Sequence, residues 1–242
     1  MKRFFLFLVL SAAVAGALLA RDGDDDAAYD RLALRAQRFY DQHDWNSATA
    51  MYIMMLDRRP QVTATYCHAI TAAGMTGDTR EQLRLLTQAL QSRVPIDSLF
   101  TGIQTASFGL GNSNLYEKFL LSARDANTWM ARNIDSYLMR YYTFRRDGGK
   151  MIRLAEAMLR GEPDSEQYNY ILAQGYLVAG RTVEAMEVYR GILSRNPGAL
   201  EALLYLGNQA AIEGDKETAK ELLSRAYAIK GTPHVAATIR SL

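Results

Sequence analysis

Apolar and small residues recur along the chain at helical spacing, and each run is bounded by a turn residue. In residues 180–197, Gly180 is followed by Ala185, Tyr189 and Ile192 on one helix face, and Pro197 closes the run. Side chains three or four residues apart share a face of a helix, and proline cannot continue one. The stretch therefore predicts a turn at Gly180 and a helix that ends before Pro197. Alternating runs of Val, Ile and Thr, which favour strands, are scarce.

The same pattern recurs at a nearly constant period. It is found again in HDWNSATAMYIMMLDRRP (43–60), TGDTREQLRLLTQALQSRVP (76–95) and EGDKETAKELLSRAYAIKGTP (213–233). The units begin near residues 29, 63, 97, 131, 166 and 200, so successive steps are 34, 34, 34, 35 and 34 residues. The third unit is degenerate, because Tyr116 stands where other units have a small residue. The fourth has one extra residue, which we place in RRDGGK (145–150), with Lys150 or Met151 at the small position.

This period and pattern resemble the tetratricopeptide repeat. The resemblance implies an all-α fold, a right-handed α-solenoid of about six helix–turn–helix units. The expected units cover 29–62, 63–96, 97–130, 131–165, 166–199 and 200–233. In the fifth unit, we expect helices at 166–179 and 182–195. Residues 234–242 are expected to form a short capping helix, whose small size leaves apolar surface exposed for self-association.

The N-terminal twenty residues predict export. Lys2 and Arg3 precede an uncharged run from Phe4 to Ala20, and Ala15-Gly16-Ala17 offers a cleavage site for a signal peptidase. The run is either a cleaved signal peptide or an uncleaved membrane anchor, since its length is at the lower limit for spanning a bilayer. In either case we expect a periplasmic protein, with membrane contact only through residues 1–20. Residues 21–28 are expected to be an acidic, solvated spacer.

Charge and residue usage argue against several functions. Without Lys2 and Arg3, 26 basic residues balance 26 acidic ones, so a basic surface for nucleic acid is not expected. The single cysteine, Cys67, has no partner for a disulfide, and we expect it to be buried in a helix. The three histidines match no metal motif, and no phosphate-binding loop is present. We therefore expect no enzyme activity, no catalytic or metal site and no cofactor.

The resemblance also implies that the first helix of each unit lines a concave groove that holds peptides or partner helices. Polar or flexible side chains at one position per unit suit hydrogen bonding to an extended backbone, and aromatic side chains beside them suit anchor pockets. The expected groove residues are Gln37, Tyr40, Thr71, Thr105, Phe108, Asp135, Met139, Tyr142, Tyr170, Gln174 and Asn208. The lysines that such repeats use to clamp carboxylate tails are absent from the corresponding positions.

The sequence thus favours a non-enzymatic scaffold or adaptor of the cell envelope, which binds a protein or peptide along this groove. The alternative is a carbohydrate-binding or carbohydrate-processing accessory protein. It would use the aromatic stretch YLMRYYTF (137–144), and in particular Tyr137, Tyr141 and Tyr142.

Overall fold

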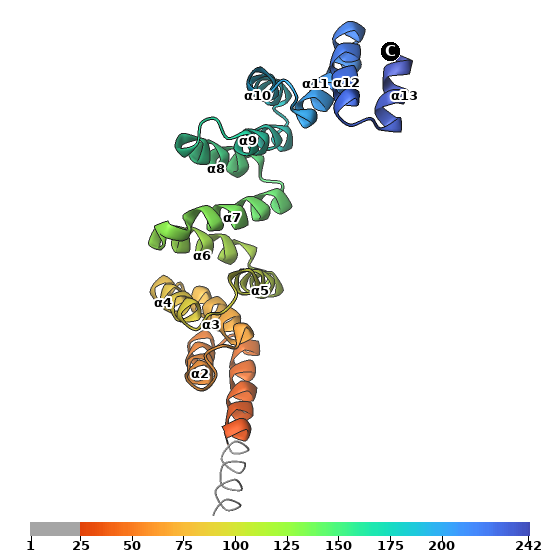
Figure 1. Cartoon of the computed structure of the whole chain (residues 1–242). Helices are drawn as coiled ribbons and strands as arrows, with labels where there is room; N and C mark the ends of the chain where they lie inside the picture. Colours follow the sequence, from red (N-terminus) through yellow and green to blue (C-terminus); the bar gives the residue numbers. More distant parts are fainter. Residues whose placement is uncertain (1–24) are drawn as a thin grey trace, which may run out of the picture. The chain divides into compact units, whose positions relative to one another are not determined.

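A computed structural model describes residues 25–242, and all regular elements of this part of the chain are helices (Figure 1). The all-α fold expected from the sequence is therefore confirmed. The first described helix covers residues 25–41. It is followed by α2 (Trp45–Arg58), α3 (Thr63–Met75), α4 (Thr79–Gln91), α5 (Ile96–Gly109), α6 (Ser113–Ala126), the 3-10 turn η1 (Thr128–Met130), α7 (Ala131–Arg145), α8 (Gly148–Gly161), α9 (Glu166–Val178), α10 (Thr182–Arg195), α11 (Leu200–Glu213), α12 (Lys216–Ile229) and α13 (Pro233–Ser241).

Each of the six predicted units contains one pair of helices, which we call helix A and helix B of repeats 1 to 6. Repeat 5, for example, consists of α9 and α10, whose bounds differ by no more than one residue from the predicted 166–179 and 182–195. Among the described helices, none is both long and apolar enough to cross a membrane. The segment 1–20, for which export was predicted, lies outside the described residues.

The turn between helix A and helix B has the same backbone conformation in every repeat. One residue adopts a positive φ, and it is glycine in four repeats, with φ from 69° to 85°. Glycine enters this left-handed region without a steric penalty. In repeats 1 and 4 the turn residue is instead His43 (φ 61°) or Arg146 (φ 52°). These turn residues give every repeat a common reference position.

An aspartate follows the turn residue in four repeats and starts helix B. The carboxylates of Asp44, Asp78, Asp147 and Asp215 accept the backbone N–H three residues later, at 2.9 to 3.2 Å. Such N-caps satisfy one of the backbone donors that the first turn of a helix leaves without a partner. Helix B therefore begins two residues after the turn residue in each repeat.

The described chain divides into two compact bodies at the Tyr137–Leu138 bond, within α7. We call residues 25–137 the N-terminal half and residues 138–242 the C-terminal half. In the N-terminal half, α3 contacts α2, α4, α5 and α6. In the C-terminal half, α8 lies against α9 and α11 against α12, as Figure 1 also shows.

Small residues permit the closest helix contacts in the C-terminal half. A Cβ on Gly207 of α11 would lie 2.8 Å from Cγ of Leu223 in α12, and one on Gly148 of α8 would lie 2.6 Å from the backbone N of Ala179. At the small position of helix B, Ala185 and Ala219 are fully buried. The helices approach each other closely because no larger side chain separates them.

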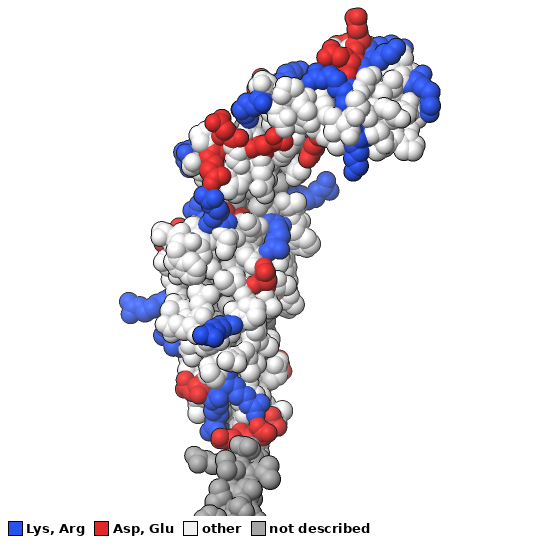
Figure 2. Space-filling view, in the orientation of Figure 1, with Lys and Arg blue, Asp and Glu red and all other residues white. Residues whose placement is uncertain are grey.

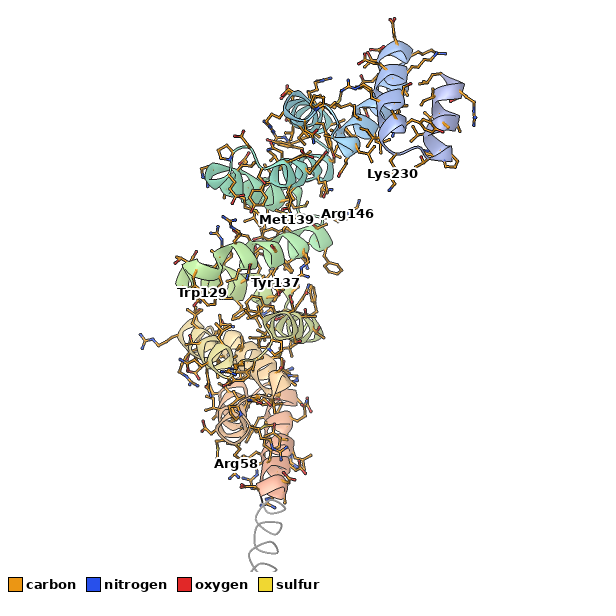
Figure 3. All side chains as sticks on the ribbon, in the orientation of Figure 1. Arg58, Trp129, Tyr137, Met139, Arg146 and Lys230 are labelled. Carbon is orange, nitrogen blue, oxygen red and sulfur yellow. The ribbon has the colours of Figure 1, made fainter. Side chains whose placement is uncertain are left out.

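Two terminal segments differ in detail from the sequence-based expectations. Of the predicted acidic spacer 21–28, residues 25–28 belong to the first described helix, and residues 21–24 lie outside the described residues. Asp25 forms an ion pair at 3.0 Å with Arg58, which is labelled in Figure 3 at the end of α2, and Asp26 pairs with the next residue, Arg59. At the other end, α13 begins at Pro233, is capped by Thr232 and packs on α12 through the buried Val235.

Candidate partner-binding surface

The structure corrects the register of repeat 4. The turn residues of repeats 3, 4 and 5 are Gly111, Arg146 and Gly180, so the extra residue lies between Gly111 and Arg146, and not after the turn. Arg146 and Met139 are labelled in Figure 3. Counting back from Arg146, the position that Gln174 holds in repeat 5 belongs to Arg140 in repeat 4, and not to Met139. The small position of helix B belongs to Met151, which is buried.

Burial agrees with this corrected register. Each predicted residue of α7 is buried, whereas the residue after it is exposed: Asp135 and Ser136, Met139 and Arg140, Tyr142 and Thr143. Asp135, Met139 and Tyr142 therefore do not line a surface. Asp135 instead accepts hydrogen bonds from the guanidinium group of Arg124, one of them from Nη2 at 3.3 Å.

In the N-terminal half, two more predicted groove residues lie in the interior. Thr71 is fully buried, and its hydroxyl donates to the backbone oxygen of Cys67 at 2.6 Å. One helical turn before Thr71, α5 approaches α3 closely, since a Cβ on Gly102 would collide with Sγ of Cys67. Tyr40 is also buried, with its ring against Trp45 and His68. Burial raises the pKa of the Tyr40 hydroxyl to about 12, so it is uncharged at neutral pH.

The other predicted residues retain surface exposure. Gln37, Thr105, Gln174 and Asn208 are exposed, and Phe108 and Tyr170 are half-buried. The amide of Gln37 donates to Asp41 at 2.8 Å, and the hydroxyl of Thr105 donates to the backbone of Thr101 at 2.9 Å. Tyr170 packs beside Tyr189, whose ring stacks on Tyr205 at a centroid distance of 4.4 Å.

Two rows of exposed side chains follow the A helices of the C-terminal half. The polar row consists of Arg140, Gln174 and Asn208, which lie six residues before the turn residue of their repeats. Four residues further along each helix lie Phe144, Val178 and Ile212, with 68%, 38% and 79% of their area exposed. Residues four apart share a helix face, so each A helix presents one polar and one apolar side chain together.

The apolar row was missed by the sequence analysis. Phe, Val and Ile are typical core residues, so their residue types do not show that this row is exposed. The register of repeat 4 becomes clear only from the positive φ of its turn residue, Arg146. One sequence signal could have located it. Aligning Asp147 with the capping residues Asp44, Asp78 and Asp215 places the turn residue of repeat 4 at Arg146 and brings Phe144 into register with Val178 and Ile212.

The aromatic stretch of α7 does not form a carbohydrate platform. Tyr137, Tyr141 and Tyr142 retain only 7%, 2% and 5% of their exposed area. Tyr137 donates a hydrogen bond to Asp97 and packs on Phe100, which ties α7 to α5. A sugar stacks on an accessible ring face, so these three buried tyrosines do not provide the carbohydrate-binding site that the alternative function requires.

Other reactive groups are held in unreactive surroundings. Cys67 is buried, and burial raises the pKa of its thiol to about 11, so the nucleophilic thiolate is disfavoured. Among residues 25–242, no group of three or more His, Cys, Asp and Glu side chains could hold a metal ion. On the face in Figure 2, basic and acidic side chains are intermixed and form no continuous basic stripe.

No protein-family model matches the chain, and no curated protein is similar to it. Solved structures resemble it at low identity. A structure of Naa15/Naa10 bound to HypK-THB has 19% identity and a TM-score of 0.47 over 88% of this chain, but this chain spans only 33% of that one.

Two further structures are of repeat proteins. The C-terminal part of a TPR repeat-containing protein from Cytophaga hutchinsonii has 14% identity and a TM-score of 0.46, covering 80% of this chain and 77% of that one. YrrB, described as a TPR protein with an unusual peptide-binding site, has 15% identity and a TM-score of 0.33, covering 86% and 89%.

The paired helices define the class of the fold, a helical-repeat solenoid. The period of about 34 residues, the left-handed turn residue and the buried alanine of helix B in repeats 1, 5 and 6 are features that these repeats share with tetratricopeptide repeats.

Proposed function

We propose that the chain is a non-enzymatic scaffold whose C-terminal half binds a polypeptide segment of a partner along its A helices. The observation that carries the proposal is the pair of exposed rows, Arg140, Gln174 and Asn208 beside Phe144, Val178 and Ile212. A partner that buries the apolar row gains hydrophobic free energy, and the polar row offers hydrogen bonds that fix its direction.

The N-terminal half offers no complete polar row. Its equivalents of the polar row are Gln37, Thr71 and Thr105, of which Thr71 is buried and unavailable to a partner. The working surface is therefore shorter than the six-repeat groove that the sequence suggested.

Site-specific photocrosslinking in the native cell tests the proposal. A photoreactive amino acid is placed at Gln174 or Asn208, and at Ser224 as a control, since Ser224 is exposed on helix B of repeat 6. One protein captured at the first two positions and absent at Ser224 is the expected result. Equal capture at all three positions, or none, would contradict the proposal.

The location is part of the same proposal. We infer an exported protein that acts in the cell envelope, supported by the basic start and apolar run of residues 1–20. Alkaline phosphatase fused after residue 24 should be active in living cells, because this enzyme needs an oxidising compartment. An inactive but stable fusion would place the scaffold elsewhere.

A further inference from the structure

A concave site lies in the C-terminal half, between α10, α11 and α12. It encloses about 250 Å³. Its floor is Leu206 and Ala210 of α11, which are almost fully buried, and its walls include the half-buried Met186, Leu193 and Leu222. The lining is thus mainly apolar, with charged residues at the edge.

Two of the residues that line the pocket, Thr218 and Leu222, are smaller than the equivalent residues of repeat 3. In repeat 3, the residues four and eight positions after the turn residue are Leu115 and Phe119, which are 5% and 1% exposed. In repeat 6 the same positions hold Thr218, which is exposed, and Leu222, which is half-buried. The larger pair is buried in repeat 3, whereas the smaller pair lines a hollow beside α10.

This site is separate from the proposed partner-binding rows. In α11, Leu206 lies two positions before Asn208, and Ala210 lies two positions before Ile212. Residues two positions apart on a helix point about 200° away from each other. The pocket and the rows therefore lie on opposite faces of α11, and one molecule of this protein presents both.

The edge of the pocket carries more negative than positive charge. Glu213 and Asp215 contribute carboxylates, and Arg190 contributes one guanidinium group. Hydrogen bonds from the Thr218 side chain and backbone lower the pKa of Asp215, so its carboxylate is ionised at neutral pH. A cation on a bound molecule would be attracted to this edge.

We propose that this pocket binds one large apolar side chain of a partner polypeptide, of the size of Leu or Phe, with a Lys or Arg beside it that pairs with Glu213 and Asp215. The volume of about 250 Å³ is below the roughly 300–1,000 Å³ typical of pockets for whole small molecules, and it suits a single side chain. Apolar side chains inserted into such pockets are common anchors of protein interfaces.

Methyl NMR of Met186 in the purified protein provides the test. The probe is a short Gly/Ser peptide with a central Leu flanked by Lys, and the matched peptides have a central Ser, or Glu in place of Lys. The Leu/Lys peptide should shift the Met186 methyl signal saturably. Each matched peptide should bind about tenfold more weakly or not at all, because it lacks either the buried side chain or the favourable charge.

A filled pocket gives the decisive control. The double variant Thr218→Leu, Leu222→Phe copies the pair of repeat 3 and should abolish the shift while the protein stays folded by circular dichroism. The variant Asn208→Ala, on the opposite face of α11, should bind the peptide normally. Equal binding of all three peptides, or unchanged binding to the filled variant, would overturn the proposal. If crosslinkers at Gln174 and Asn208 capture no partner, the proposed function of the rows is contradicted. The pocket proposal is then still decided by the peptide experiment.

Discussion

Repeats 3 and 6 have the same helix pair, but they use helix B differently. Phe119 of repeat 3 is 1% exposed, whereas Leu222 at the equivalent position of repeat 6 is half-buried beside a pocket. The contrast extends to the halves that contain them. The described aromatic side chains that are less than 2% exposed, Tyr66, Phe100, Tyr116 and Phe119, all lie in the N-terminal half. Repeat 3 thus buries a large aromatic side chain at a position where repeat 6 leaves a smaller side chain beside a pocket.

The largest expected effect tests this contrast directly. Phe119→Ala should destabilise the N-terminal half by about 3–5 kcal/mol, since it leaves a cavity in a closely packed core. Leu222→Ala, the matched change, should cost only about 1 kcal/mol, because that side chain is already half exposed. Urea unfolding followed by tryptophan fluorescence reports the first variant, since both tryptophans, Trp45 and Trp129, lie in the N-terminal half. Circular dichroism reports the second. Equal costs would mean that the two halves are packed alike.

A smaller effect is expected from the ion pairs. The Asp135 side chain is 8% exposed and that of its partner Arg124 is 32% exposed. Arg124→Ala leaves the carboxylate buried without this partner and should cost about 2 kcal/mol, somewhat less than a fully buried pair. Arg225→Ala in the C-terminal half, where the partner Glu221 is 67% exposed, should change stability by about 0.5 kcal/mol or less. Urea midpoints of the two variants provide the measurement. If Arg225→Ala lost more stability than Arg124→Ala, the ion pair of the N-terminal half would not be the more important one.

The N-terminal half should also depend on pH through His68. This ring lies between Tyr40 and Tyr52, and burial lowers its pKa. The unfolded chain therefore binds the proton more readily than the folded one. Stability should be complete above the ordinary histidine pKa of about 6.5 and should fall as the pH drops below it. The hydroxyl groups of Tyr40 and Tyr52 stay uncharged in this pH range, because burial raises their pKa. The negative charge of Asp41 raises both pKa values further.

His68→Phe keeps an aromatic ring between the two tyrosines and provides the matched control. Urea unfolding of both proteins should be followed by tryptophan fluorescence between neutral and mildly acidic pH. The variant should lose less stability than the parent over this interval. Parallel curves would show that carboxylates alone cause the acid sensitivity.

The fold was predictable from the sequence because the repeat period is carried by several residues in every unit. Glycine at the turn and proline after helix B were enough to place α9 and α10 within one residue. The surface was less predictable. In repeat 4 an arginine occupies the left-handed turn position, so the usual glycine signal is missing and the count shifted by one residue. In repeat 2, Thr71 is buried in a helix that packs closely on α5, where Gly102 lies against Cys67, and no local pattern encodes this tertiary contact.

The smallest effect on stability should come from the surface with the largest effect on binding. Ile212 is 79% exposed at the end of α11, so Ile212→Asp should change the free energy of unfolding by no more than about 0.5 kcal/mol. The same change places a charge in the apolar row and should abolish capture of the partner by a crosslinker at Asn208. Val183→Asp is the matched control, because Val183 is 66% exposed on helix B of repeat 5, outside the rows. If both variants retain capture, the apolar row is not the binding surface, whereas loss only with Ile212→Asp separates binding in the C-terminal half from the packing that stabilises the N-terminal half.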